Sequence, residues 1–516
     1  MRATSLGHAG ILIESGTSTI LCDPWFVPAF FGSWFVFPRN DQLPAEVLAK
    51  IESPTHLYIS HVHGDHLDEA FLADHVSRDA TVLLPDFPGR ELERRLSALG
   101  FTKFLKSQNG IEISIDDQTK IAIHVETSIT DGPGGDSALV VSDNKTRLVN
   151  QNDCRTGNLD ALRSHGPIDL HWLQYSGAIW YPMVYEQDDA TKLKLAKAKV
   201  ESQFSRALKY VETLDARAVV PSAGPPCFLD EELFHMNMIT GDEISIFPDQ
   251  TKFLQKLKEL GRTKDILAIP GTTVDITPQS ISVSQPENTN LAEIFDQKEK
   301  YLRKYQSDWA SWLKDEKQKW QSAPSDLIVA LQAWFEPLMA LAPALRAGIG
   351  ANCLIKTDNL DIFINFQLGK VERFNKQEFG FRFDIPRDLL ETIVKQRAVD
   401  WSNSFFLSCR FTAWRSGEFN EYIYNFFKSL SVERITRTEL EAASRLKIDK
   451  DLSDEIELGD YVMQRKCPHR QADLSVFGQI NGEELTCSLH GWRFSLIDGK
   501  CLNAEDRPLR VRKRNS

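Results

Sequence analysis

The sequence lacks a long uncharged hydrophobic run. None of its 516 residues belongs to a stretch of the ~18 apolar side chains that a membrane-spanning helix needs. The first residues also lack the basic region, the long apolar core and the small-residue cleavage site of a secretory signal peptide. We therefore expect a cytoplasmic protein that has no membrane partner.

Positive charge is also in short supply. Lys and Arg number 60 against 72 Asp and Glu, so the formal net charge is −12. Binding to nucleic acid needs a basic surface, and this composition argues against a nucleic-acid partner. The one basic run, within residues 507–514, lies at the C-terminus. It is predicted to be a solvated tail, with docking of an acidic electron carrier as the alternative.

Cysteines are few and lie far apart. The eight cysteines fit reduced thiols better than a disulfide framework. The sequence also has no G-x-G-x-x-G fingerprint, so it shows no flavin or nicotinamide domain of its own. The rest of the composition, with 42% hydrophobic and 26% charged residues, is that of a globular protein. The length predicts about three domains.

The pattern of expected elements changes twice along the chain. Residues 1–285 alternate short β runs with helical patterns, as in an α/β domain. Residues 286–430 contain helical patterns followed by strands and predict an α+β domain, in which residues 401–411 are expected to form a strand. Residues 431–516 are short β runs with Asn-Gly and Asp-Gly turns, which predict an all-β domain.

Four potential metal ligands of the last domain have the spacing C-x-H-x17-C-x-x-H. They are Cys467, His469, Cys487 and His490. Two thiolates and two imidazoles on two loops fit a Rieske 2Fe–2S cluster, in which two Cys hold one iron and two His hold the other. A Cys2His2 zinc site is the alternative. The continuation CSLHGWRF resembles Rieske ferredoxins and oxygenases, which favours the cluster.

A second group of ligands follows the strand expected at residues 56–60. His61, His63, Asp65 and His66 form the pattern H-x-H-x-D-H, which resembles the metallo-β-lactamase superfamily. This resemblance implies an αββα sandwich. It also implies that His61 and His63 bind one metal, while Asp65 and His66 bind a second.

Two further aspartates fit the same superfamily. Asp23, in the segment CDPW, matches an aspartate that orients the ligands without touching the metal. Asp153 follows a β run in the segment NQNDC and matches the carboxylate that can bridge two metals. The resemblance therefore makes Asp65 and Asp153 the predicted catalytic residues.

Two other ligands of the superfamily are harder to find. A histidine is expected between the first motif and Asp153, but residues 127–136 contain none. Either Asp131 replaces this histidine or the position is vacant, because His124 lies in an alternating run typical of a strand. The last histidine of the superfamily should follow the strand at residues 218–221. His235 is the histidine of this domain that comes after it, and we include it among the predicted ligands.

Taken together, the two motifs resemble the CMP-N-acetylneuraminate hydroxylases. The similar segments are residues 6–25, 26–39, 57–67, 152–154, 175–177, 181–183 and 221–224, with a middle region near 401–430. The resemblance implies hydroxylation of a nucleotide sugar with iron, dioxygen and electrons, and a sterol-carrier-like α+β middle domain. That family carries its Rieske domain first, whereas here it is last. The substrate is therefore left open as a nucleotide sugar or another small polar metabolite.

The combination of sites favours an oxygenase over a hydrolase. A zinc hydrolase uses its metal as a Lewis acid and needs no electrons, so a one-electron cluster would be idle beside it. We predict an oxygen-dependent hydroxylase (a monooxygenase) with one or two irons in the N-terminal site and zinc as the alternative. Its partners would be dioxygen, a small-molecule substrate and an external donor such as a ferredoxin, a b-type cytochrome or a reductase. The Rieske domain must fold back on its own chain or dock on another subunit of a homo-oligomer.

Two other functions fit parts of the sequence. One is a metal-dependent hydrolase whose Rieske domain senses redox state or is structural. The other is an electron carrier or binding protein with a degenerate N-terminal site. An aromatic loop either covers the substrate pocket or forms a core contact. It contains Phe30, Phe31, Trp34, Phe35 and Phe37.

Overall fold

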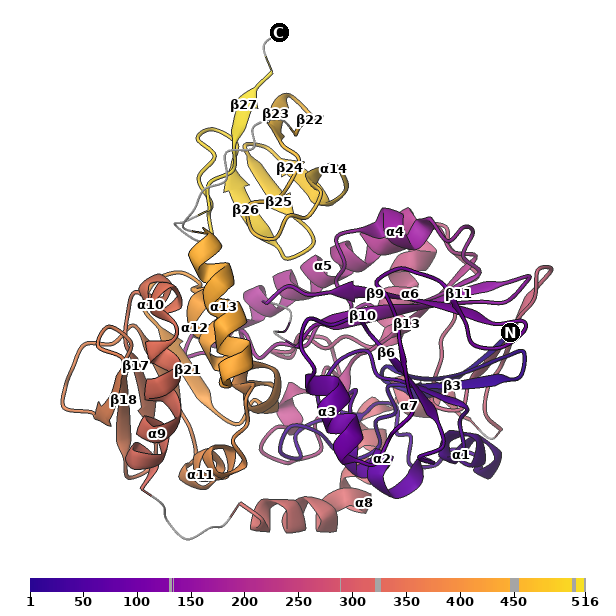
Figure 1. Cartoon of the computed structure of the whole chain (residues 1–516), viewed down its shortest axis with the longest axis horizontal. Helices are drawn as coiled ribbons and strands as arrows, with labels where there is room; N and C mark the ends of the chain where they lie inside the picture. The colour runs from indigo at the N-terminus through magenta and orange to yellow at the C-terminus, as the bar shows by residue number, and fades with distance from the viewer. Residues whose placement is uncertain are drawn as a thin grey trace.

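The computed structural model describes residues 1–129, 132, 134–287, 289–320, 326–445, 454–503 and 507–514. Figure 1 shows a large N-terminal domain, a middle domain beside it, and a small C-terminal domain that lies above α5 and next to the end of α13. These helices comprise Asp189–Leu214 and Val432–Arg445, respectively.

Two β-sheets form the centre of the N-terminal domain. In spatial order, the first contains β16 (Ile281–Ser284), β15 (Thr273–Ile276), β1 (Arg2–Gly7), β2 (Gly10–Ser15), β3 (Ser18–Cys22), β5 (His56–Tyr58), β6 (Thr81–Leu84) and β7 (Phe104–Lys106). The second contains β13 (Ala218–Ser222), β12 (Leu170–Gln174), β11 (Arg147–Asn152), β10 (Asp136–Ser142), β9 (Lys120–Glu126) and β8 (Ile113–Ser114).

Both faces of each sheet are covered, as β10 illustrates. Leu139 and Val141 belong to the core between the two sheets, whereas Ala138 and Val140 point to the opposite face and pack under helices. Every residue of β10 is therefore buried. The first sheet is covered by α1 (Ala45–Glu52), α2 (Glu69–His75) and α3 (Glu91–Ala98), and the second by α4 (Leu159–Arg163), α5 and α6 (Gln250–Glu259). The expected αββα sandwich is confirmed.

Parallel pairing sets the position of the site. β3 pairs with β5, and β11, β12 and β13 pair in succession, all in parallel. Parallel strands bring their carboxyl ends to one edge of a sheet, where polar loops can meet. Asp23 directly follows β3 and the loop with His61 follows β5, while Asp153 follows β11 and Ser176 follows β12.

The aromatic loop packs against a helical segment that follows the sandwich. This segment contains α7 (Leu291–Phe295) and α8 (Lys298–Gln318). Phe35 lies edge-on to Tyr305 and Trp309, with ring centroids 6.0 and 5.5 Å apart. Phe30 and Trp34 are buried in a second cluster that extends into the middle domain. Phe35 therefore forms a core contact, which was one of the two expected roles of this loop.

The middle domain is an α+β unit built on a five-stranded sheet. In spatial order its strands are β19 (Lys370–Arg373), β18 (Asp361–Asn365), β17 (Cys353–Lys356), β20 (Phe381–Asp384) and β21 (Thr412–Arg415). Its helices are α9 (Leu327–Ala340), α10 (Pro343–Ile349), α11 (Arg387–Gln396), α12 (Glu421–Phe427) and α13. No single described helix is long and apolar enough to cross a membrane. Taken together, α9 and α10 have the length and hydropathy of such a helix, but the pair is bent by 103°.

One predicted strand of this domain is wrong. Residues 401–411 begin with two short helical turns, Trp401–Phe405 and Phe406–Ser408. The side chain of Asp400 caps the first turn by accepting the backbone N–H of Asn403 at 2.8 Å. Aromatic side chains here are buried on several sides of the chain, so the apolar run has no alternation from which strand and helix could be distinguished.

The C-terminal domain consists of two three-stranded sheets, which confirms its all-β class. One contains β22 (Glu455–Leu458), β23 (Tyr461–Gln464) and β27 (Val511–Lys513), and the other contains β24 (Gly478–Asn481), β25 (Glu484–Cys487) and β26 (Trp492–Ser495). A short helix, α14 (Leu474–Phe477), joins them. The domain boundaries at 285/286 and 430/431 stay predictions.

Candidate metal centre and iron–sulfur site

The loop after β5 places three imidazoles around one point. His61 and His66 are buried, and their ring centroids lie 4.0 Å apart. His63 is half-buried, and its Nδ1 lies 2.8 Å from Nε2 of His61. The neighbouring carboxylates approach His66, whose Nε2 lies 3.6 Å from Oδ2 of Asp153 and 3.8 Å from Oδ2 of Asp65. The structure thus brings all five residues predicted from the first motif and from Asp153 into one site.

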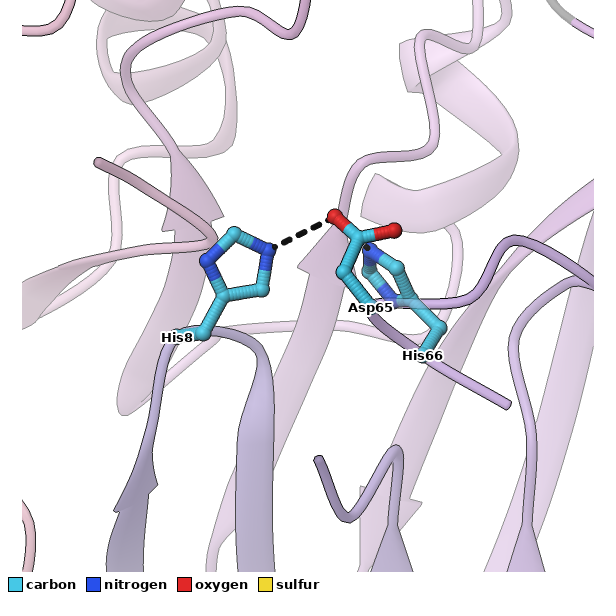
Figure 2. Close-up of side chains that lie close together, drawn as sticks. All are labelled: His8, Asp65 and His66. Carbon is cyan, nitrogen blue, oxygen red and sulfur yellow. Dashed lines mark hydrogen bonds and ion pairs between the residues drawn. The ribbon is translucent and has the colours of Figure 1, made fainter. Parts of the chain in front are cut away.

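Two groups of potential ligands share His66. One contains His61, His66 and Asp153, and the other contains His8, Asp65 and His66. In each group one ligand atom of every residue lies within 4.8 Å of the others. Figure 2 shows the second group, in which His8 and His66 face the Asp65 carboxylate from two sides. This geometry could hold one or two metal ions.

His8 is a candidate ligand that the sequence analysis missed. It lies in the tight turn between β1 and β2, with φ of 49°, and its Nε2 is 3.1 Å from Oδ2 of Asp65. Its ring is buried and packs edge-on against Trp25, with centroids 4.9 Å apart. The available signal was a histidine in the hairpin turn Gly7-His-Ala-Gly10 within a segment that resembles the hydroxylases. Its contact with Asp65 depends on the strand order, which the sequence did not reveal.

Asp23 and its neighbours hold His66 in place. Oδ1 of Asp23 accepts the backbone N–H of Ser60 at 2.7 Å, and Oδ2 lies 3.2 Å from Nδ1 of His66. The side-chain amide of Asn152 also donates to Asp23. A hydrogen bond from Nδ1–H of His66 leaves its Nε2 free to bind a metal, which is the usual arrangement for a metal-binding histidine. Asp23 thus lies where the superfamily resemblance puts it.

The charges of this site suit a cation. Burial alone would lower the pKa of His66, but Asp65 and Asp153 raise it well above its usual range. Burial would raise the pKa of Asp153, but His66 and His61 lower it. Nε2 of His66 and Oδ1 of Asp153 are buried without a hydrogen-bond partner among the described residues. A metal ion would satisfy both atoms, and a mixed histidine and carboxylate set suits iron as well as zinc.

The remaining predicted ligands lie elsewhere or cannot be placed. Asp131 lies outside the described residues. His124 on β9 pairs with His165, their Nε2 atoms 2.8 Å apart, and belongs to neither ligand group. The structure does not bring His235, another predicted ligand, into either ligand group. It lies on the short helix Phe234–Met236. The side chains of Phe234 and Met236 are buried, whereas His235 is exposed to solvent.

The four predicted cluster ligands converge at one end of the C-terminal domain. The rings of His469 and His490 have centroids 5.0 Å apart, and His469 stacks on Trp492 at 4.0 Å. A hydrogen bond between the two buried sulfurs raises the pKa of Cys467 and lowers that of Cys487. Backbone N–H groups from the following residues of each loop also point at the sulfurs. Such donors stabilise thiolates, so these residues fit a Rieske cluster.

Each cluster histidine faces a different domain. Nε2 of His469 lies 3.4 Å from Oε2 of Glu421, on the first turn of α12. Arg507 binds Glu421 and also donates to the backbone carbonyl of His469 at 2.7 Å. Arg507 is buried and β27 pairs with β23, so this basic run is not the solvated tail expected from the sequence. His490 lines a cavity of about 400 Å³ between the C-terminal domain and the loop after Asp153. The C-terminal domain thus folds back onto both other domains of its own chain.

The C-terminal domain meets the sandwich at the loop that follows Asp153. A methyl group added to Gly157 would lie 3.8 Å from the Leu489 side chain and 3.8 Å from Cα of Ala472. Leu489 precedes the cluster ligand His490, and Gly157 lies four residues after Asp153. At a second contact between the two domains, Phe477 packs against Tyr210 of α5, with ring centroids 6.0 Å apart. The loop after Asp153 and the loop that carries His490 therefore face each other across the boundary between the two domains.

Sequence comparisons agree with this arrangement. A family model described as an Rv3818-like, SCP2-like domain matches residues 327–444, and a Rieske [2Fe-2S] domain model matches residues 450–512. A Rieske 2Fe–2S iron–sulfur protein of Mycolicibacterium smegmatis is 41% identical over 524 residues, which cover 99% of this chain and 100% of the relative. A Mycobacterium tuberculosis relative with the same description is 41% identical over 99% of both chains. The chain belongs to this family of Rieske iron–sulfur proteins.

Other similarities are more distant. A cytidine monophosphate-N-acetylneuraminic acid hydroxylase of Danio rerio is 25% identical over 238 residues, 43% of this chain and 37% of its own. Among solved structures, CmlA, a diiron β-hydroxylase of Streptomyces venezuelae, has a TM-score of 0.34 at 16% identity, covering 55% of this chain and 54% of its own. Igni18, a metallo hydrolase of Ignicoccus hospitalis, has a TM-score of 0.36 at 16% identity over 55% of this chain and 99% of its own.

These comparisons confirm three predictions. The C-terminal domain is a Rieske domain, which excludes the alternative of a plain zinc site there. The middle domain has the expected sterol-carrier-like fold. The similarity to the CMP-N-acetylneuraminate hydroxylases also holds across part of the chain. This chain therefore combines an αββα sandwich, an SCP2-like domain and a C-terminal Rieske domain.

Proposed function

We propose that this protein is a Rieske-dependent iron oxygenase that hydroxylates a small polar substrate. The observation that carries the proposal is the cavity lined by both Gly157 and His490, because it places the loop after Asp153 opposite a ligand loop of the Rieske cluster. When bound, the cluster would supply single electrons and the iron would supply the chemistry of dioxygen. A nucleotide sugar is one candidate substrate, supported by the similarity to the CMP-N-acetylneuraminic acid hydroxylases.

The residues of the N-terminal site have separable tasks in this proposal. His61, His66 and Asp153 would hold one metal ion, and His8 with Asp65 would extend the set toward a second. Asp136 lies 3.3 Å from Nδ1 of His61. As the acceptor of Nδ1–H, it would orient that ring toward the metal.

The residues around the cluster would hold its ligands and leave one histidine facing the sandwich for electron transfer. The protein buries Cys467, Cys487 and His469 and leaves the edge of His490 on the interdomain cavity. An imidazole that binds iron through one ring nitrogen keeps its other N–H for an outward hydrogen bond. The His490 loop and the loop after Asp153 line the same cavity, which contains Gly157, Leu489 and His490 among its lining residues. An external donor would have to reload the cluster.

The deciding experiment is metal analysis with EPR on anaerobically purified protein. We expect a Rieske signal and additional iron in the N-terminal site. After chemical reduction, dioxygen and substrate should reoxidise the cluster. Asp153→Ala should lower the iron content of the N-terminal site and stop this coupled reoxidation, while the Rieske signal stays.

Two results would support other functions. Zinc in the N-terminal site with full activity in the absence of reductant would indicate a metal-dependent hydrolase with a redox-sensing or structural Rieske domain. A filled cluster without any second metal would indicate an electron carrier. An unchanged Rieske spectrum in His469→Cys or His490→Ala would contradict the ligand assignment itself.

A further inference from the structure

The middle domain docks on the sandwich through α13. Near the start of this helix, Arg434 binds Glu91 at the beginning of α3, with each carboxylate oxygen 2.9 Å from a guanidinium nitrogen. One turn later, Arg437 donates to the backbone carbonyl of Thr127 at 3.4 Å. Thr127 begins the segment in which the superfamily histidine is missing. The helix therefore lies against the sandwich at the place where a further ligand was expected.

Arg434 joins the two domains from a buried position. Its side chain is 4% exposed. Besides Glu91 of the sandwich, its Nη1 lies 2.8 Å from Oδ2 of Asp400 and 3.0 Å from the backbone carbonyl of Lys428, both in the middle domain. A guanidinium is a planar fork with five N–H donors, so it can bind both carboxylates at once. A lysine ammonium is a compact point charge, which keeps the attraction but loses this geometry.

Helix α3 extends this connection to the metal ligands. Arg95 lies one turn after Glu91 on the same helix, and its Nη1 donates to the backbone carbonyl of Val62 at 3.1 Å. Val62 stands between the candidate ligands His61 and His63. Its carbonyl belongs to the planar peptide unit that joins it to His63, so the hydrogen bond restricts the backbone that aims this ligand. A continuous set of contacts thus runs from the middle domain to the metal site.

Two glycines show that Arg434 also lies close to the ligand loop itself. A Cβ atom on Gly134 would lie 3.2 Å from Cγ2 of Val62 and 3.6 Å from Nη2 of Arg434. A Cβ atom on Gly132 would lie 3.7 Å from Nε2 of His63. Gly134 is therefore in contact with both the ligand loop and Arg434, and its lack of a side chain allows this approach.

We propose that Arg434 and Arg95 are positioning residues of the N-terminal metal centre. Through Glu91, Arg434 ties α3 to the middle domain, and Arg95 extends this tie to the backbone between His61 and His63. The SCP2-like domain is thus part of the metal centre rather than an independent module, because its docking sets how these two imidazoles are aimed. The inference concerns the geometry of the ligands and not the reaction, so it goes beyond the proposed oxygenase function and does not rest on it.

The test uses Co²⁺ as a probe of the N-terminal site in the full chain, with the Rieske cluster retained and oxidised. The two ferric ions of an oxidised cluster are coupled and give no EPR signal that would overlap with that of Co²⁺. Competition with a chelator gives the Co²⁺ affinity, and the EPR spectrum reports the ligand geometry. We expect Arg434→Lys and Arg95→Met each to weaken Co²⁺ binding about tenfold and to change its spectrum, as when outer partners of metal ligands are lost.

A double variant and a control on the same helix sharpen the test. Arg434→Lys combined with Arg95→Met should weaken Co²⁺ binding no more than either change alone, because both changes break one connection. Arg94→Met is the matched control. Nη2 of Arg94 lies 2.7 Å from Oε2 of Glu433, so this residue also joins α3 to α13, but its side chain is 58% exposed. An exposed ion pair contributes little, so Arg94→Met should bind Co²⁺ with the affinity and spectrum of the wild type.

Two results would overturn the proposal. Wild-type Co²⁺ affinity with an unchanged spectrum in Arg434→Lys would show that the middle domain does not position the ligands. Tenfold losses that multiply in the double variant would show two independent effects instead of one connection through α3. Should Arg434→Lys fail to fold, Arg95→Met leaves the buried Arg434 and its two carboxylates paired, and wild-type Co²⁺ binding by this variant would overturn the proposal by itself.

The outcome is separable from that of the oxygenase proposal. Co²⁺ affinity needs neither dioxygen nor electrons from the cluster, whereas iron content and coupled reoxidation decide the oxygenase. A hydrolase with weakened Co²⁺ binding in both variants would keep the positioning role and remove the oxygenase. Coupled reoxidation in a protein whose Co²⁺ binding is indifferent to Arg434 and Arg95 would do the reverse.

Discussion

His66 shows how single residues determine this metal centre. Its ring is fully buried and lies within 4 Å of carboxylate oxygens from Asp23, Asp65 and Asp153. One carboxylate fixes the ring through Nδ1, and the other two approach Nε2, so the roles of the carboxylates differ by geometry. An imidazole in this position either carries a proton or binds a metal, because three anions require a compensating positive charge.

His8 should contribute to metal binding although it is far from the motif in sequence. We expect His8→Ala to lower the affinity of the N-terminal site for iron by roughly 10–100-fold, comparable with loss of a ligand-supporting group. Iron per chain, measured after dialysis against a chelator, gives the result. His235→Ala is the matched control, because His235 is exposed and in neither ligand group. Normal iron retention in His8→Ala would leave His8 as only a neighbour of Asp65.

Glu421 should lower the reduction potential of the Rieske cluster. Its carboxylate faces Nε2 of His469 and is buried with Arg507, so its negative charge opposes the addition of an electron. We expect Glu421→Gln to raise the potential by roughly 30–60 mV, given 59 mV per tenfold for a one-electron couple. Arg507→Met should shift it in the opposite direction. EPR-monitored redox titration measures the reduction potential of each variant. Shifts of the same sign in Glu421→Gln and Arg507→Met, or no shift in either, would contradict this assignment.

At the scale of elements, contacts within one short loop could be predicted from the sequence, whereas contacts that depend on strand order could not. The Rieske ligands could be predicted because each Cys–His pair lies on one short loop, so spacing alone brings the ligands together. His8 could not, because its contact with Asp65 requires β1, β2, β3 and β5 to lie side by side. His235 was chosen by its order in the chain, and burial of its neighbours turned it outward. The strand expected at 401–411 failed because an apolar run buried on several sides has no period.

The second sheet contains a pH-dependent pair of histidines on and beside β9. His124 on β9 and His165 after α4 share one hydrogen bond, and burial together with His165 lowers the pKa of His124 to about 4. The unfolded chain binds a proton near pH 6.5, before the folded chain does, so stability should fall as the pH falls from about 6.5 to 4. We expect a loss of about 1–3 kcal/mol from this residue.

Chemical denaturation at several pH values checks this prediction. His124→Gln should show a shallower loss of stability between pH 6.5 and 4 than the wild type. His75→Gln changes an exposed histidine of α2 and should follow the wild-type curve. Parallel curves for the wild type and His124→Gln would mean that other groups cause the acid sensitivity.

At the scale of the whole molecule, the Rieske domain acts as a link between the other two. Its His469 side meets Glu421 of the SCP2-like domain, and its His490 side meets the sandwich near Asp153. Both metal motifs could be identified in the sequence. Whether the Rieske domain folds back on its own chain or docks on another subunit could not. Docking depends on surfaces assembled from α5, the loop after β11 and the first turn of α12, and none of these has a local sequence signal.

Gly157 allows this docking to be tested with the two sites themselves intact. It is not a predicted ligand, and a methyl group there would be in ordinary contact at 3.8 Å from Leu489 and Ala472. Gly157→Ala should therefore keep the wild-type rate at which dioxygen and substrate reoxidise the reduced cluster. Gly157→Leu extends beyond this Cβ toward Leu489 and Ala472, so we expect its larger side chain to push the Leu489–His490 loop away. Misplacing reacting groups by about 1 Å can lower a rate by a factor of about 10². We therefore expect Gly157→Leu to slow reoxidation of the cluster roughly tenfold or more.

Stopped-flow absorbance of the Rieske cluster measures both rates, with iron content and EPR spectra as checks that the sites are filled. The comparison is informative because the two variants differ only in side-chain volume at one contact between domains. If Gly157→Leu reoxidised its cluster as fast as Gly157→Ala, the electrons would not depend on this contact. They would then have to cross between subunits or reach dioxygen without the N-terminal iron, and the intramolecular route would have to be abandoned.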